Sequence, residues 1–248
     1  MGTESQPCAD TVRIAAEYPA RVIDHVDIRA SDLGASERFY DTVLPVIGRQ
    51  RLSAEGYVEW GDFALHAATD DSPATRRLHI GFYAATREFV DAFHHAGTEA
   101  GYRDDGDFLL DPDGNSVEAV NNTQARKPGA IDHLWIRVAD LAAAKRFYEN
   151  VAPYAGIRLE DDTLERVQFV CENGSFSLLA GEAPSENIHM AFGASENATV
   201  DAFHRAAIEA GGRDNGAPGE RPIYHAGYYG AFVLDPDGNN IEAVNHNG

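Results

Sequence analysis

Two histidines and one glutamate occur at matching places in both halves of the chain, each within a run typical of a β-strand. The six residues are His25, His79 and Glu118 in the first half and His133, His189 and Glu242 in the second. A glutamate between apolar strand residues is costly to bury unless a cation or a metal ion compensates its charge. Because two imidazoles and a carboxylate are typical ligands of divalent metals, the pattern predicts a metal site twice over.

The elements that must position these residues follow one order. Val26 and Ile28 point to one side of the first strand and His25 to the other, as strand alternation requires. A helix capped by Ser31-Asp32 and two short strands at 57–60 and 63–67 come next. A second unit then runs from the His79 strand through a helix that Thr86 opens. It ends with an Asp-Pro-Asp-Gly-Asn turn before the glutamate strand.

The whole pattern is repeated, which divides the chain. We expect a tail at residues 1–20, a first domain at 21–122, a linker at 123–129 and a second domain at 130–248. The two histidines recur at offsets of 108 and 110 residues and the glutamate at 124. The larger last offset reflects an insertion at about 217–230, which is rich in aromatic and polar residues.

The amino-acid composition restricts the classes of partner and the cellular location that we expect. The 248 residues contain 20 Lys and Arg against 40 Asp and Glu, a formal net charge of -20. Such a charge argues against nucleic acid and anionic membrane as partners. Cys8 and Cys171 form no disulfide framework, and neither a membrane-spanning run nor a signal peptide is evident. We therefore expect a cytoplasmic protein.

The quoted motifs, with Arg-Phe-Tyr in the first helix of each half, resemble the vicinal oxygen chelate superfamily over about residues 21–246. This is the superfamily of glyoxalase I, extradiol dioxygenases, fosfomycin-resistance enzymes and bleomycin-binding proteins. The resemblance implies an α+β fold of tandem glyoxalase-like domains, with four βαβββ modules whose mixed sheets form cups around a metal. It also implies the same six metal ligands: His25, His79, Glu118, His133, His189 and Glu242.

The resemblance leaves the pairing of modules open. Where the modules of one half share a site, His133 joins His189 and Glu242; where modules pair across the halves, His25 joins them. A fourth ligand position of many glyoxalases aligns with His66 in the first half, as a ligand or a strand-end histidine, and with Leu179 in the second.

The insertion has a resemblance of its own. Ile-Tyr-His225, followed by Ala-Phe232 and the Asp-Pro-Asp-Gly turn, is similar to the extradiol dioxygenase pattern, in which a histidine and a tyrosine aid proton transfer. Phe232 takes the place of that tyrosine, so a loop tyrosine must substitute. We expect His225, Tyr224 and Tyr229 as catalytic residues, with Tyr228 as a further substitute.

Other polar residues have plainer interpretations. His94, His95 and His204 lie on predicted helices and are read as structural or solvated. Arg29 and Arg137 share the strand face of the histidines, where they meet either a substrate anion or an acidic neighbour.

Together these features favour a metal-dependent enzyme acting on a small organic substrate with vicinal oxygens. Fe²⁺ is the first expectation, because two histidines and a carboxylate leave open positions for dioxygenase-like chemistry. Mn²⁺, Ni²⁺ or Zn²⁺ would suit glyoxalase-like isomerisation or lyase chemistry.

The alternative is a non-catalytic drug- or metabolite-binding protein of the bleomycin-resistance type, with a cationic ligand stacked on Trp60, Trp135 and tyrosines. In either case the partner is a small molecule. The tandem repeat makes the chain either a monomer with an internal pseudo-dimer or part of a homodimer.

Overall fold

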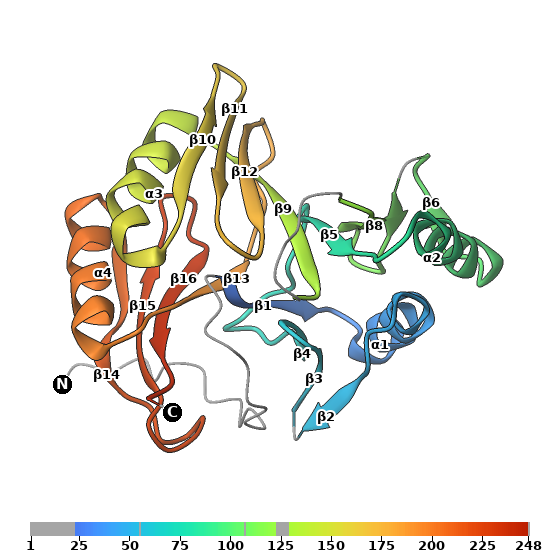
Figure 1. Cartoon of the computed structure of the whole chain (residues 1–248), viewed down its shortest axis with the longest axis horizontal. Helices are drawn as coiled ribbons and strands as arrows, with labels where there is room; N and C mark the ends of the chain where they lie inside the picture. The colour runs from blue at the N-terminus through green and yellow to red at the C-terminus, as the bar shows by residue number, and fades with distance from the viewer. Residues whose placement is uncertain (1–22, 55, 107, 123–128, 248) are drawn as a thin grey trace.

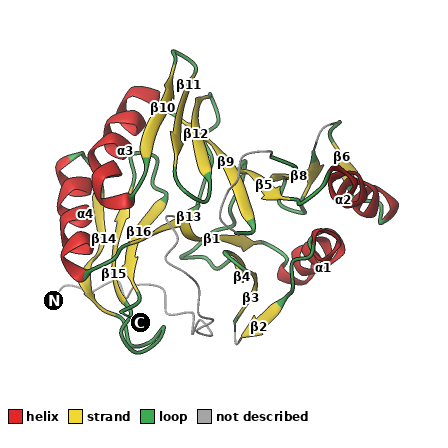
Figure 2. Cartoon of the chain, in the orientation of Figure 1, coloured by secondary structure: helices red, strands yellow, loops and turns green. Residues whose placement is uncertain are grey.

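The computed structural model of the chain describes residues 23–54, 56–106, 108–122 and 129–247. The predicted tail at 1–20 with Cys8, and the predicted linker except Gly129, lie outside these residues. Two mixed sheets form the centre of the molecule, and the four α-helices of the described part lie along their outer sides (Figure 1, Figure 2). None of the described helices is long and apolar enough to cross a membrane.

Each half contains two βαβββ modules, as expected. The first half comprises β1 (Ile23–Ala30), α1 (Leu33–Val43), the 3-10 helix η1 (Pro45–Ile47), β2 (Leu52–Ala54), β3 (Tyr57–Trp60) and β4 (Phe63–Ala67), then β5 (His79–Tyr83), α2 (Arg87–Glu99), β6 (Arg103–Asp104), β7 (Leu109–Leu110) and β8 (Ser116–Val120). The second comprises β9 (Ile131–Val138), α3 (Leu141–Ala155), β10 (Arg158–Asp162), β11 (Arg166–Val170) and β12 (Ser175–Ala180), then β13 (His189–Gly193), α4 (Asn197–Glu209), β14 (Arg213–Glu220), β15 (Tyr229–Leu234) and β16 (Asn240–Asn245).

Each sheet combines one module from each half of the chain. The first sheet has the strand order β14-β15-β16-β13-β1-β4-β3-β2, and the second has β10-β11-β12-β9-β5-β8-β7-β6. Antiparallel pairs join the modules, β1 with β13 in the first sheet and β5 with β9 in the second. The first and last modules therefore share one sheet, and the two middle modules share the other.

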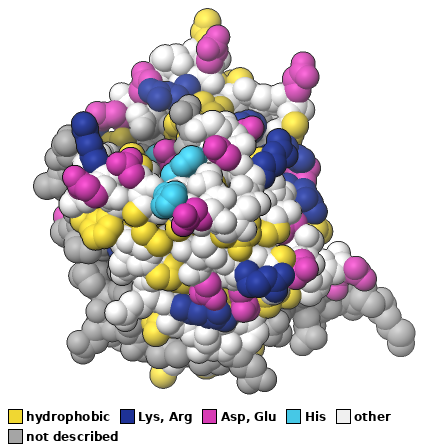
Figure 3. Space-filling view, turned by 90° about the vertical axis from the view of Figure 1, so that its right-hand side faces the viewer, with side chains coloured by type: hydrophobic (Ala, Val, Ile, Leu, Met, Phe, Trp, Pro, Cys, Tyr) yellow, Lys and Arg dark blue, Asp and Glu magenta, His cyan; other side chains and the backbone are white. Residues whose placement is uncertain are grey.

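Local sequence explains the helices. The side chain of Asp32 accepts a hydrogen bond of 2.9 Å from the backbone N–H of Ala35 at the start of α1, and Asp140 does the same for α3. Aromatic side chains of the inner helix faces are fully buried against the sheets, as Phe39 and Phe147 show. The outer surface is polar: acidic and basic side chains are interspersed over the side where α1 and α2 lie (Figure 3).

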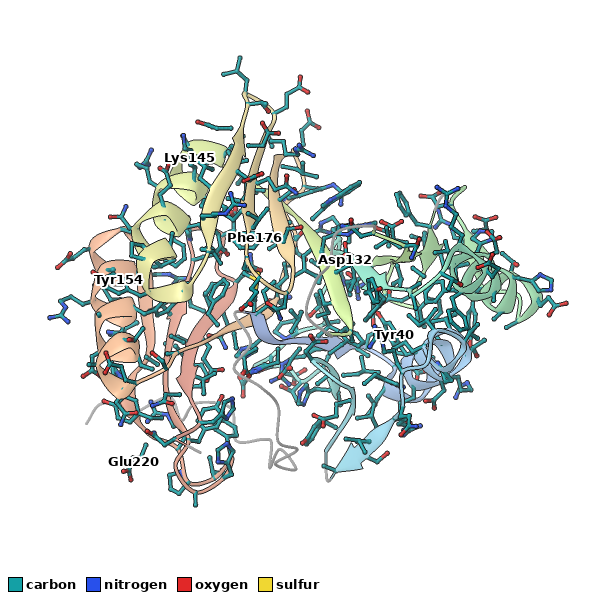
Figure 4. The ribbon with its side chains drawn as sticks, viewed as in Figure 1. Tyr40, Asp132, Lys145, Tyr154, Phe176 and Glu220 are labelled. Carbon is teal, nitrogen blue, oxygen red and sulfur yellow. The ribbon has the colours of Figure 1, made fainter. Side chains whose placement is uncertain are left out.

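The repeated turn motif connects each glutamate strand to a helix. Asp111 Oδ1 accepts hydrogen bonds from the backbone N–H groups of Asp113 and Asn115, at 2.9 and 2.8 Å. Its Oδ2 accepts one from the hydroxyl of Tyr40, the tyrosine of the Arg-Phe-Tyr motif in α1, at 3.0 Å (Figure 4). The two sequence motifs are therefore parts of one buried hydrogen-bonded connection.

The second copy of this connection makes the same contacts. The carboxylate of Asp235 accepts a hydrogen bond from the hydroxyl of Tyr148 at 3.1 Å and another from the backbone N–H of Asn239 at 2.9 Å. Burial raises the pKa of Asp235 to about 6, although the hydrogen bonds oppose that rise. All of its described partners are donors, so the carboxylate cannot be exchanged for an amide without loss.

We predict that Asp235→Asn destabilises the fold by roughly 1–3 kcal/mol, because the new NH₂ group faces donors inside the protein. The measurement is the midpoint of chemical denaturation. Asp161→Asn is the control, since Asp161 forms an exposed ion pair with Arg166 and is expected to change stability by less than about 1 kcal/mol. An unchanged midpoint for Asp235→Asn would contradict this account of the motif.

Candidate metal sites

The first sheet brings His25, His189 and Glu242 together, and we call this cluster site 1. The two Nε2 atoms lie 3.1 Å apart, and Glu242 Oε2 lies 3.1 Å from His189 Nε2 and 3.5 Å from His25 Nε2. Strand register explains the meeting: His25 pairs with Ala191 across β1 and β13, and Ala191 pairs with Glu242 across β13 and β16. The Glu242 side chain is only 1% exposed.

Neighbouring side chains hold these three residues in place. Asp24 Oδ1 lies 2.7 Å from His25 Nδ1, and the hydroxyl of Tyr228 donates to Glu242 Oε1 at 2.5 Å. The amide of Asn240 lies 2.5 Å from His189 Nδ1. Each contact uses an atom turned away from the centre of the cluster. The remaining atoms, His25 Nε2, His189 Nε2 and Glu242 Oε2, point toward one another.

The second sheet forms the matching cluster from His79, Glu118 and His133, which we call site 2. Glu118 Oε1 lies 3.0 Å from His79 Nε2 and 3.2 Å from His133 Nε2, and the two Nε2 atoms are 3.2 Å apart. Asp132 and Ser116 hold the Nδ1 atoms of His133 and His79 at 3.0 and 2.9 Å. Asp132 lies on β9, where the two halves meet (Figure 4).

The donor sets of both clusters fit a divalent metal ion. Bonds of about 2.1 Å at angles of about 90–110° place neighbouring ligand atoms ~3.0–3.4 Å apart, close to the separations in sites 1 and 2. A neutral histidine that donates Nδ1–H to Asp24 or Asp132 turns the lone pair of Nε2 toward the cluster. A metal ion is the group that would satisfy several lone pairs at one point.

Electrostatics keep the carboxylates ionised. Burial alone would raise the pKa of Glu242, but its histidine partners outweigh burial and lower it to about 2. The pKa of Glu118 is about 2 for the same reasons. At His133 burial would lower the pKa, yet hydrogen bonds with Asp132 and Glu118 raise it to about 9. A metal entering site 2 must displace that proton, so its affinity there is expected to rise with pH up to about 9.

The structure decides between the two pairings that the sequence left open. His25, from the first half, meets His189 and Glu242, while His133 meets His79 and Glu118. The geometry therefore favours pairing across the halves at both sites. His66 lies close to site 1 but contacts Asp27, whose Oδ2 is 3.2 Å from His66 Nε2.

Asp27 is a candidate ligand that the sequence analysis missed. It lies two residues after His25 on the same face of β1, opposite His189, and its carboxylate groups with both histidines within 4.8 Å. The alternation of side chains along the strand could have indicated it, because residues 25 and 27 project from the same face. The repeat hid it, because the matching residue of the second half is Trp135.

The three residues expected to be catalytic lie in different places. His225 Nε2 lies 2.9 Å from His246 Nδ1, and His246 Nε2 lies 3.1 Å from Asp24, which holds His25. Tyr224 packs on Tyr228 with ring centroids 4.7 Å apart.

The hydroxyl of Tyr229 donates to Asp201 at 2.8 Å, and the residue is half-buried against the hydrophobic core. Tyr228, a further tyrosine of this loop, donates its hydroxyl hydrogen bond to a candidate ligand, Glu242.

The histidines on the helices have the expected surface positions. His94 pairs with Asp104 at 3.3 Å, His95 with Glu99 at 3.2 Å, and His204 with Asp214 at 3.0 Å. Trp60, in contrast, is fully buried in the core next to Tyr40. It therefore cannot stack on a ligand as the binding-protein alternative expected.

Comparison with known proteins confirms the resemblance. The family model described as Glyoxalase/Bleomycin resistance protein/Dioxygenase superfamily matches residues 130–243. The second half of the chain therefore matches the model of this superfamily, and solved structures with the corresponding fold cover 90% of the chain. Comparison with curated proteins gave no match.

Solved structures support the tandem fold. Glyoxalase I from Zea mays is 20% identical, with 90% of this chain and 92% of that chain covered and a TM-score of 0.64. A candidate dioxygenase from Bacillus subtilis subsp. subtilis str. 168 is 10% identical, with coverages of 91% and 85% and a TM-score of 0.62. At these identities the likeness establishes the fold alone.

We predict that Gly81→Ala disrupts site 2 while site 1 persists. A Cβ at residue 81 would lie 2.3 Å from Cε1 of His133, so the imidazole must move. Ala191 holds the matching register position at site 1, and Ala191→Gly is the control. Metal titration of both variants is the measurement: Gly81→Ala should lose one binding event. Two retained events would show that His133 does not bind metal in this position.

Proposed function

We propose that the protein is a metal-dependent enzyme that acts on a small organic substrate with vicinal oxygens, and that site 1 is its catalytic centre. The observation that carries the proposal is the convergence of His25 Nε2, His189 Nε2 and Glu242 Oε2 within 3.1–3.5 Å of one another. Three protein ligands would leave coordination positions for a substrate.

Site 1 is favoured over site 2 by the groups around it. Tyr228 fixes one oxygen of Glu242. The contact of Asp24 with His25 does not distinguish the sites, because Asp132 makes the same contact with His133. Asp27 adds a carboxylate next to both histidines, within reach of a ligand hydroxyl proton. At site 2 the position of Asp27 holds an indole, which stacks on His79 and brings no proton acceptor.

A divalent ion at site 1 would act as a Lewis acid that lowers the pKa of a substrate hydroxyl. Ferrous iron is our first choice, because two histidines and one carboxylate are the donor set of open iron sites in oxygenases. In this proposal Asp27, the further candidate ligand, would not bind the ion but would receive the hydroxyl proton, and His66 would hold Asp27 in place. Mn²⁺, Ni²⁺ or Zn²⁺ would instead support isomerase or lyase chemistry.

A binding protein without chemistry is the second candidate. It would explain the fold equally well. It gives no physical reason, however, for two convergent His/His/Glu clusters whose side chains are held in place by further hydrogen bonds. The stacking surface it requires is also reduced, because Trp60 lies in the core. Metal content separates the two proposals.

We predict about two equivalents of divalent metal per chain purified without chelator. His189→Ala and Glu242→Ala should each lose one equivalent together with activity, because they remove a ligand of site 1. The matched variants His79→Ala and Glu118→Ala should also lose one equivalent but retain activity. Elemental analysis gives the metal, and oxygen uptake with catechols or isomerisation of hemithioacetals gives the activity.

Protein that contains no metal and cannot be loaded would refute the enzyme proposal and favour the binding protein. Activity that disappears only with His79→Ala and Glu118→Ala would instead move the catalytic centre to site 2.

We predict that Tyr228→Phe weakens metal binding at site 1 by about 10- to 100-fold, because Glu242 loses the hydrogen bond that orients it. Tyr229→Phe is the matched control, since the Tyr229 hydroxyl bonds to Asp201 and should leave metal affinity unchanged. Competition with a metal-binding dye measures both. If Tyr229→Phe abolishes activity at full metal occupancy, Tyr229 has the catalytic role that the sequence suggested.

A further inference from the structure

The faces that carry the two metal sites differ at matching register positions. On β1, Asp27 follows His25 on the same face, and it pairs with Ala64 of β4, which pairs with Glu59 of β3. Registered neighbours project to the same side of a sheet. The site 1 face therefore carries two additional carboxylates in this row, Asp27 and Glu59.

The corresponding row of site 2 contains no carboxylate. On β9, Trp135 follows His133, and it pairs with Ser177 of β12, which pairs with Gln168 of β11. An indole replaces Asp27 and an amide replaces Glu59. The face of site 2 has thereby lost two negative charges relative to the face of site 1.

The next row supplies positive charge. Arg137 follows Trp135 on the same face, and it pairs through Leu179 with Arg166. Arg166 is neutralised by Asp161 at 2.6 Å. Arg137 forms no ion pair with any described residue; its Nη1 donates to the backbone carbonyl of Arg77 at 3.1 Å, and its side chain is exposed. Its guanidinium is available to an anion from solution.

Trp135 lies two residues before Arg137 on the same strand face, so a large apolar ring stands beside this charge. Its indole stacks on the His79 ring with centroids 4.3 Å apart and an angle of 22°, and Phe108 meets it edge-on at 6.2 Å. Trp135 is half-buried, and the Glu118 and His133 side chains are 22% and 14% exposed. Solvent therefore reaches the carboxylate of site 2, whereas at site 1 it reaches His189, which is 20% exposed, but not Glu242, which is 1% exposed.

We propose that the site 2 face is a second ligand site, specific for a planar ring that bears a carboxylate. Arg137 receives the carboxylate in a charge-assisted contact, and Trp135 provides the surface against which the ring lies. The Asp27 and Glu59 row makes the site 1 face unfavourable for the same anion. The inference stands on Arg137 and Trp135 and holds whether or not site 1 is catalytic.

The probes are 3,4-dihydroxybenzoate and catechol, which share the ring and the vicinal hydroxyls and differ in the carboxylate. Metal contacts are common to both and cancel in the comparison. We expect the full chain to bind the carboxylate probe at least about 10-fold more tightly by calorimetry, as one charge-assisted contact allows. Arg137→Gln should abolish this preference, Arg137→Lys should restore part of it, and Arg29→Gln at site 1 is the matched control.

Location is read from the indole N–H resonances, because the chain has two tryptophans and Trp60 is buried. The carboxylate probe should shift the Trp135 resonance, which Trp135→Phe assigns, and leave that of Trp60 in place. Equal affinity for the two probes, a preference that survives Arg137→Gln, or one that Arg29→Gln removes would each overturn the proposal. Loss of catalytic activity in the site 1 variants alone would leave it intact.

Discussion

The antiparallel pairing of β1 with β13, and of β5 with β9, is the constraint on which both sites depend. It places His25 beside Ala191, one strand from Glu242, and brings together residues 164 positions apart in the chain. Neither half contains a complete cluster by itself. The buried Glu242 has one imidazole, His189, from its own half, and this pairing delivers the second, His25, which helps to compensate its charge. Assembly of the sheets and assembly of the sites are therefore one event.

Much of this organisation could be predicted from the sequence, because the signals were local. Strand alternation, capping residues and the Asp-Pro-Asp-Gly turn indicated an order of strand, helix and strands, and the repeat identified the histidines and glutamates. The family resemblance then implied the four βαβββ modules. The choice of partner module was not predictable, since either pairing satisfies the same alternation and the same turns. Asp27 was overlooked for a related reason: a search for residues shared by both halves discards those that one half has lost.

The insertion lies beside site 1, as the sequence indicated, but the residue that contacts a candidate ligand is not the one expected. The residues before Glu242 were expected to contain a proton-transfer group, and they do lie beside site 1. His225 nevertheless contacts His246, which reaches His25 through Asp24, whereas Tyr228 contacts the glutamate. Sequence pattern specified that polar and aromatic groups surround the site. Backbone geometry decided which of them touch it.

Duplication within one chain permits the two sites to diverge. In a symmetric dimer of one-domain chains, a substitution next to one site appears at the other as well. Here Asp27 and Trp135 occupy matching positions of unlike sites, and Glu59 and Gln168 do the same two strands further out. The metal-binding pattern is common to both sites, and each face carries an arginine, Arg29 or Arg137, at the same position. The row next to the ligands is acidic at site 1 and neutral at site 2. If metal binding and ligand recognition were selected separately, the metal ligands would stay the same at both sites while their neighbours changed. The two sites show this pattern.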